Sequence, residues 1–198
     1  MQAIDWAVNE CKADIISMSF GFEEENDLID IALDNATRAG KLVIAAASNN
    51  GGRSGRARPA RREDVICIHA TDGYGNKGGM NPSPQAQKDN FATLGVAVPL
   101  KWKDNNVYKS GTSFAVPIAV GFAADILEFA KYRCTNLKKR RLDILHQKAG
   151  MEAVFREMAK DIRDGYSFIY PVRFWGNLQD TETELQAAKA IEDIMEKF

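Results

Sequence analysis

The chain has 198 residues, of which 45% are hydrophobic and 27% charged, a composition typical of a globular protein with a sizeable core. The formal net charge of -1 gives no general reason to expect nucleic acid or an anionic membrane as a partner. The cysteines Cys11, Cys67 and Cys134 form no CxxC pair, which favours buried free thiols over a disulfide scaffold or a zinc site.

The first 40 residues predict a helix, a strand and a second helix. Apolar residues recur at helical spacing from Ile4 to Cys11, and the apolar run 15–18 predicts a buried strand. Asn26 and Asp27 can cap the second helix, which is expected to end at Gly40. The expected inner face of that helix comprises Leu28, Ile31, Ala32 and Ala36.

Three further apolar segments, 42–47, 65–69 and 91–98, predict strands, and a long helix is expected from about Ser113 to Arg133. Strands without polar alternation are typical of a parallel sheet whose two faces are both covered by helices. The alternation of helices and strands therefore predicts an α/β layered fold. Charged helical segments after Cys134 predict an α-helical extension over residues 134–198.

Two segments, 50–63 and 72–90, are rich in Gly, Asn, Ser and Pro and are the predicted loops. Open α/β sheets place their sites in loops that follow strand ends. The first loop carries a basic run of five arginines, at 53, 56, 58, 61 and 62, and Lys138–Arg141 forms a second run. Without interleaved aromatic residues, both runs are interpreted as solvated faces and not as a nucleic-acid surface.

The stretch GTSFAVP, from Gly111 to Pro117, marks the start of the long helix. Gly111 permits a tight turn, and Ser113 falls at the helix N-terminus, where the field favours negative charge. Pro117 lacks an N–H and is tolerated only near a helix start. Taken alone, the stretch is compatible with an ordinary helix start or with an exposed nucleophilic serine.

The longer stretch GTSFAVPIAVG resembles the serine motif of the subtilisin-like serine proteases and matches each of its fixed positions through Gly121. This resemblance makes Ser113 the nucleophile. LVIAAASNNGG, from Leu42 to Gly52, resembles the family strand that ends in Ala-Ala-Gly-Asn-x-Gly and makes Asn49 the oxyanion-hole donor. Ser48 stands where the family usually has glycine, and an ordinary Asn-Gly turn is the alternative interpretation.

A third stretch, AIDWAVNECKADIISMSFGF, is similar to the family helix that precedes Asp-Val-x-x-Met-Ser-Leu-Gly. The resemblance implies that Ser19, Phe20 and Gly21 pair with an extended polypeptide substrate like an added strand. Ala46 and Ala47 would form the opposite wall of a pocket open to sizeable apolar side chains. The bulk of Phe20 could instead fill core.

Acyl transfer by serine also needs a base, and the family order is Asp, His, Ser. The chain contains two histidines, His69 and His146, and neither lies in the family's histidine context. Loss of the histidine costs about 10⁶ in turnover, so the chain alone is expected to be close to inactive. We therefore expect residues 1–133 to be the C-terminal portion of a longer peptidase domain, whose three-layer fold and mainly parallel sheet are incomplete at the N-terminal side.

Two functions remain open from the sequence. The first is a serine endopeptidase that acts through an acyl-Ser113 intermediate, and the second is a non-catalytic remnant of the same fold that binds extended peptides. A nucleotide-binding domain is disfavoured because no glycine-rich phosphate loop opens a helix.

The resemblance requires no cofactor. Structural calcium is common in the family, but no acidic cluster has the spacing that demands it, so no metal ligand is predicted. No apolar stretch is expected to reach the roughly 20 residues of a membrane helix, and no membrane partner is predicted. Localisation stays open, although the absence of disulfide-type cysteine spacing favours an intracellular protein.

Overall fold

The computed structural model describes residues 2–159, 162–176 and 181–198. Its six-stranded sheet has the order β1-β2-β3-β4-β8-β7, and the first five of these strands run parallel. The strands are β1 Ile15–Met18, β2 Leu42–Ala46, β3 Ile66–Thr71, β4 Phe91–Leu94, β7 Ile162–Arg163 and β8 Tyr166–Phe168. A separate antiparallel hairpin joins β5 Val98–Trp102 to β6 Asn105–Lys109.

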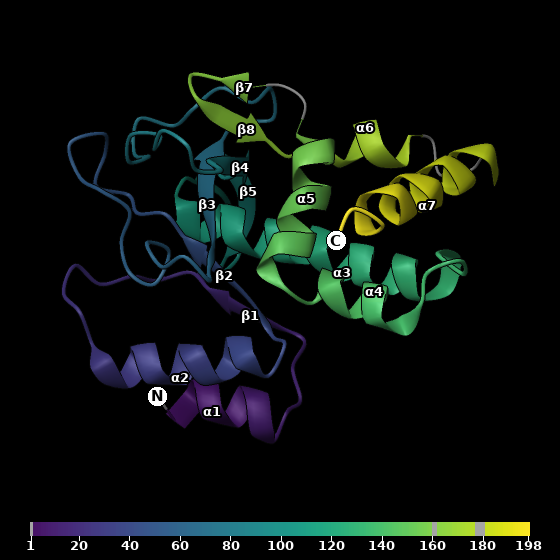
Figure 1. Cartoon of the computed structure of the whole chain (residues 1–198). Helices are drawn as coiled ribbons and strands as arrows, with labels where there is room; N and C mark the ends of the chain where they lie inside the picture. Colours follow the sequence, from purple (N-terminus) through teal and green to yellow (C-terminus); the bar gives the residue numbers. More distant parts are fainter. Residues whose placement is uncertain (1, 160–161, 177–180) are drawn as a thin grey trace.

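Helices cover both faces of the sheet, so the predicted three-layer α/β fold is confirmed (Figure 1). On one face lie α1 Gln2–Asn9 and α2 Asp27–Arg38. On the other face α3 Thr112–Arg133 lies against the strands. The helices that share its hydrophobic core are α4 Lys139–Leu145, α5 Lys148–Met158, α6 Pro171–Trp175 and α7 Thr181–Met195. Alternate β2 residues serve the two cores: Ile44 packs with α3, and Val43 packs with α2.

The cap of α2 is Asn26, whose side chain accepts a hydrogen bond from the Ile29 amide at 3.2 Å, as predicted. The buried face of α2 consists of Ala32, Leu33 and Ala36. The prediction was wrong for Leu28 and Ile31, which are 57% and 54% exposed. A helix turns about 100° per residue, and these two side chains fall on the flank beside the buried stripe.

The predicted strand 91–98 is interrupted. β4 ends at Leu94, and β5 begins only at Val98, after a turn in which Ala97 has a φ of 54°. Gly95 enables this turn to pack closely, because a Cβ there would lie 2.7 Å from the Ala70 Cβ. The close approach brings the loop against the start of α3.

The segment 134–198 is mainly helical, but it also extends the sheet. β8 pairs in parallel with β4, and β7 pairs with β8 through a tight turn at Asp164 and Gly165. Both turn residues have positive φ, 50° and 85°, as expected for an Asp-Gly hairpin turn. The boundary at residue 133 stays a prediction, although this pairing ties the later segment to the main sheet.

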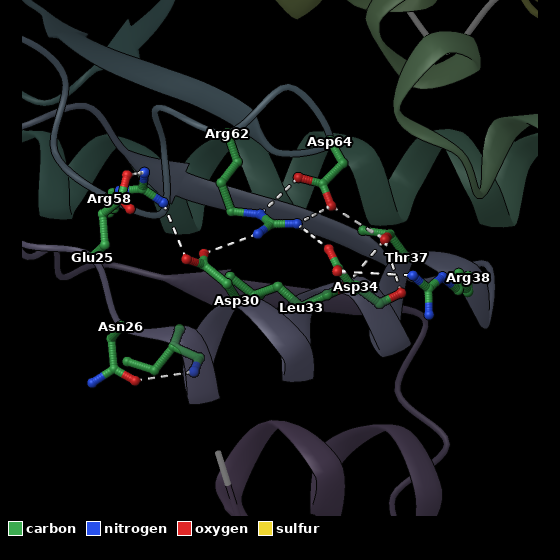
Figure 2. Close-up of polar contacts among 11 residues, drawn as sticks. Glu25, Asn26, Asp30, Leu33, Asp34, Thr37, Arg38, Arg58, Arg62 and Asp64 are labelled. Carbon is green, nitrogen blue, oxygen red and sulfur yellow. Dashed lines mark hydrogen bonds and ion pairs between the residues drawn. The ribbon is translucent and has the colours of Figure 1, made fainter.

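The basic run in the loop 50–63 is a solvated face only in part: Arg53 and Arg61 are exposed as interpreted, but the interpretation was wrong for Arg56, Arg58 and Arg62, which are buried or partly buried. Arg62 donates hydrogen bonds to Asp64, at 2.8 and 2.7 Å, and to Asp30, at 2.9 Å, and it also pairs with Asp34 (Figure 2). Arg58 bonds to Asp30 at 3.1 Å. Because Asp30 and Asp34 lie on α2, these ion pairs fasten the loop to the helix.

The charge of Arg62 shifts the pKa of one carboxylate in this network, that of Asp64. Burial alone would raise the pKa of Asp64, but the hydrogen bonds and charge of Arg62 outweigh it and lower that pKa. Arg56 is buried as well, and its guanidinium donates to the Asp89 carbonyl at 2.7 Å and to the Asn90 side chain at 2.8 Å. Arginines that the sequence pattern predicted to be solvent-exposed therefore hold the loop in place.

The central helix α3 contacts β1, β2, β3 and β4. Among the described residues it is the one helix long and apolar enough to cross a membrane by length and composition, contrary to the sequence expectation. A core helix passes the same test, and the fully buried Ala115, Ala119 and Ala123 show why these residues are apolar here. Their small side chains let α3 lie close to the sheet.

Candidate active site

The candidate site lies where the carboxyl ends of β1 and β2 meet the first turn of α3. The two strands are parallel neighbours, with Met18 opposite Ala45, so the residues that follow them leave the sheet at the same edge. Ser19 follows β1, Asn49 follows β2, and Ser113 is the second residue of α3. The structure thus brings together three predicted residues that are far apart in the chain.

Ser113 and Ser19 are joined by reciprocal hydrogen bonds. The Ser113 hydroxyl donates to the Ser19 carbonyl at 2.8 Å, and the Ser19 hydroxyl donates to the Ser113 carbonyl at 2.9 Å. The Ser113 carbonyl is available because its helical donor would be Pro117, which has no N–H. Pro117 thereby frees the carbonyl that ties α3 to β1.

Asn49 is oriented by Thr112. The Asn49 Oδ1 accepts from the Thr112 amide at 2.8 Å and from the Thr112 hydroxyl at 3.1 Å. A backbone N–H can only donate, so these contacts assign the oxygen and leave Nδ2 as the free donor end of the side chain. Thr112 is fully buried, and its role was missed in the sequence although it stands inside the GTS motif.

The arrangement can receive a negatively charged oxygen. Amides in the first turn of a helix have no intrahelical acceptor, and the helix dipole adds positive potential there. The Thr112 amide is occupied by Asn49, and both Asn49 and Ser113 line one cleft. The Asn49 Nδ2 group and the Ser113 amide are thus two candidate donors for the oxyanion of a tetrahedral acyl intermediate.

A cleft of about 250 Å³ adjoins Ser113. Its lining comprises Phe20, Gly21, Phe22, Glu23, Ala46, Ser48, Asn49, Asn50, Ala57, Thr112 and Ser113. The predicted substrate-binding residues Phe20, Gly21 and Ala46 all contribute. Ser19 does not line the cleft, and its hydroxyl is taken up by Ser113.

Ala47 does not line the cleft, and the prediction was wrong there. It is fully buried in the core between the sheet and α2. Successive residues of a strand point to opposite faces, so Ala46 and Ala47 cannot both wall the same pocket.

Phe20 is not core. Its side chain is 52% exposed and packs edge-on against Phe22, with ring centroids 5.8 Å apart. Gly21 between them is required for close packing, because a Cβ there would lie 2.7 Å from the Ala57 Cβ. Phe22 and Arg58 exchange two backbone hydrogen bonds of 2.9 Å, which close the arginine-rich loop over the cleft.

The two histidines lie elsewhere. His69 is fully buried, its Nδ1 bonds to the Phe91 carbonyl at 3.0 Å, and its ring packs against Tyr166. His146 lies 3.8 Å from Asp14. Neither histidine lines the cleft, as expected from their positions in the sequence.

The cysteines are all free, and Cys67 and Cys134 are buried as predicted, whereas Cys11 is exposed. Burial raises the pKa of both buried thiols to about 12, which keeps them protonated. In the part of the chain that the structure describes, no three His, Cys, Asp or Glu side chains gather in a way that could hold a metal ion. Structural calcium stays an untested prediction.

Comparison with known proteins identifies the family. The profile of the subtilase family matches residues 1–159. The chain belongs to the subtilase family. A thermostable alkaline protease of Halalkalibacterium halodurans is 35% identical over 141 residues, which cover 70% of this chain and 38% of that protein. Subtilisin DY of Bacillus licheniformis is 33% identical over 132 residues, 64% of this chain and 47% of that protein.

A longer match is the subtilisin-like protease het-Q2 of Podospora anserina, 27% identical over 94% of this chain and 57% of that protein. The chain therefore spans between about two fifths and three fifths of these relatives. Among solved structures, the prenylagaramide maturation protease PagA superposes with a TM-score of 0.70 at 23% identity, over 94% of this chain and 66% of PagA. This likeness confirms the subtilisin-like fold.

The backbone conformation at Ser48 explains why subtilases usually have glycine at this position. Ser48 has a φ of 144°, in the region that favours glycine, and its hydroxyl accepts from the Asn50 amide at 3.2 Å. Ser48→Gly removes the strain and the hydrogen bond, whereas Ser48→Ala removes only the bond. We expect the Gly variant to exceed the Ala variant in free energy of unfolding by about 1 kcal/mol. Urea denaturation of both variants measures this difference, and equal stability would contradict the backbone strain.

Burial of His69 predicts a pH-dependent stability. It lowers the pKa of His69 to about 4, against about 6.5 in an unfolded chain. Between these values the unfolded state binds more protons, so the free energy of unfolding falls as the pH falls. From pH 7 to 4.5 this histidine should contribute a loss of about 2 kcal/mol. Urea titrations should show that His69→Gln loses less stability over this range than the wild type. The same dependence of the free energy of unfolding on pH in the wild type and in His69→Gln would contradict this prediction.

Proposed function

We propose that the protein containing this chain is a serine endopeptidase that cleaves polypeptides through an acyl-Ser113 intermediate. The observation that carries the proposal is the convergence at one sheet edge of the Ser113 hydroxyl and the free amide group of Asn49, fixed by Thr112. Membership of the subtilase family and the names of the relatives support it.

In the proposed reaction the Ser113 oxygen attacks the peptide carbonyl carbon while its proton passes to a base. The carbonyl oxygen becomes an oxyanion that the Ser113 amide and the Asn49 Nδ2 receive. The intermediate collapses, the C–N bond breaks, and the amine leaves with a proton. Water then attacks the acyl-serine and releases the acid, so the reaction requires no cofactor.

No histidine is among the residues that line the cleft. We infer that a histidine outside these 198 residues supplies the base, together with the carboxylate that orients it. Its entry must displace the Ser113 hydroxyl from the Ser19 carbonyl, to which that hydroxyl now donates. We therefore expect Ser113 to be unactivated in the chain by itself, because its hydroxyl donates to a carbonyl and not to a base.

The same contact favours the alternative function, a peptide-binding module without catalysis. In that case the cleft would hold an extended peptide beside Ser19, Phe20 and Gly21, and Ser113 would serve only to join α3 to β1. The two functions differ in the reactivity of Ser113.

A fluorophosphonate probe tests this reactivity in the full-length protein. The serine oxygen displaces fluoride from phosphorus only when its proton is removed, so labelling should map to Ser113 and vanish in Ser113→Ala. Ser110→Ala, which removes a hydroxyl three residues away, is the matched control and should retain labelling. Asn49→Leu should lower kcat for peptide hydrolysis by roughly 10²–10³, the cost known for an oxyanion donor in subtilisin itself.

Two results would contradict the endopeptidase. One is labelling that persists in Ser113→Ala. The other is a full-length protein that neither reacts with the probe nor hydrolyses peptides, which would favour the binding module.

A further inference from the structure

The cleft beside Ser113 contains a charge that the sequence resemblance did not assign. In its described lining one side chain is ionisable, that of Glu23. The rest of the lining combines the apolar Phe20, Phe22, Ala46 and Ala57 with neutral polar residues, which are Ser48, Asn49, Asn50, Thr112 and Ser113. A cleft with two aromatic rings and a single carboxylate suits a side chain that has an apolar stem and a positive head.

Glu23 is held at the cleft and is not neutralised there. Its carboxylate accepts a hydrogen bond from the Asn50 side chain at 3.4 Å, and Asn50 directly follows the oxyanion residue Asn49. Within the described part of the chain, no lysine or arginine forms an ion pair with Glu23. Glu25, two residues on, is instead paired with Arg58. Of the three consecutive glutamates 23–25, Glu23 is the one that lines the cleft, and it has no cationic partner among the described residues.

The size of the cleft indicates what it can hold. Its volume of about 250 Å³ lies below the roughly 300–1,000 Å³ of sites for small-molecule ligands, and it suits a single amino-acid side chain. Phe22 and Glu23 also line a neighbouring hollow with Glu24, Glu25 and Asn26, so Glu23 belongs to both hollows. A long side chain that enters beside Ser113 therefore shares the cleft with Glu23.

We propose that Glu23 makes this cleft selective for a lysine or arginine of the substrate, at the residue whose carbonyl Ser113 attacks. That this residue precedes the cleaved bond rests on the proposed function. Binding of its side chain by Glu23 requires only that an extended peptide lies in the cleft. The carboxylate supplies an ion pair with the cation, and Phe20 and Phe22 contact its stem. The apolar preference expected from the two alanines is thereby replaced by a basic one.

The first test compares arginine with citrulline, which has nearly the same shape and no charge. Peptides identical except at this residue are hydrolysed by the full-length protein. We expect kcat/KM to favour arginine about 5-fold, the value of a partly exposed ion pair. In Glu23→Gln the ratio should fall to about 1. Glu24→Gln removes the same charge one residue away, outside the cleft lining, and should keep the ratio.

Salt gives a second readout. Raising the ionic strength from 0.1 to 1 M shortens the screening length from about 10 to 3 Å, so the arginine preference of the wild type should shrink. A preference for citrulline or equal rates in the wild type would overturn the proposal. An arginine preference that survives in Glu23→Gln would also overturn it.

Binding separates this inference from catalysis. The Ser113→Ala variant of the 198-residue chain is titrated calorimetrically with N-acetylated peptides ending in arginine or citrulline. About 5-fold tighter binding of the arginine peptide, lost in the added Glu23→Gln variant, supports the inference even if the probe fails to label Ser113. Equal affinities, or no binding of either peptide at millimolar concentration, contradict it. If the probe labels Ser113 but the arginine peptide binds no more tightly than the citrulline peptide, the proposed endopeptidase function is supported and only the basic specificity is contradicted.

Discussion

Two sets of hydrogen bonds join the carboxyl ends of β1 and β2 to the first turn of α3, and the geometry of the site depends on them. Asn49 accepts from the amide and hydroxyl of Thr112, and Ser19 exchanges hydroxyl-to-carbonyl bonds with Ser113. The first set gives the Thr112 amide, which has no acceptor within the helix, a hydrogen-bond partner, and it orients the donor end of Asn49. The second exploits the carbonyl that Pro117 leaves without a partner.

The fold supplies the rigid frame for these contacts. α3 packs along β1 to β4 through small buried side chains, so its start is fixed relative to the strand ends. On the other face, Arg62 and its three aspartates hold the loop 50–63 to α2 (Figure 2). The Phe22–Arg58 backbone pair ties the same loop to the segment that follows β1. The arginine-rich loop thus shapes the cleft without contributing a positive charge to its lining.

Local chemistry made much of this site predictable. Ser113 and Asn49 stand in short motifs whose residue types follow from acyl transfer, and the apolar strands predicted the parallel sheet. The predictions that were wrong or absent concern contacts between residues far apart in the chain, or the direction in which a side chain points. Ala47 faces the opposite core from Ala46, and the arginines find their carboxylates on a helix some 30 residues earlier in the chain. β8 was missed although Asp164-Gly165 is a hairpin signal, because its pairing with β4 spans distant segments. Glu23 follows a strand in an acidic run, and only the folded loop shows that it lines the cleft.

The most direct test of the central contact is amide hydrogen exchange at Thr112, measured by NMR. First-turn helix amides normally lack an acceptor and exchange quickly, so the bond to Asn49 predicts slow exchange at Thr112. Asn49→Leu should accelerate that exchange by about 10-fold or more, which corresponds to a hydrogen bond of roughly 1.4 kcal/mol. Asn49→Asp, which keeps the acceptor, should remain protected. Fast exchange in the wild type, or protection unchanged in Asn49→Leu, would contradict the account.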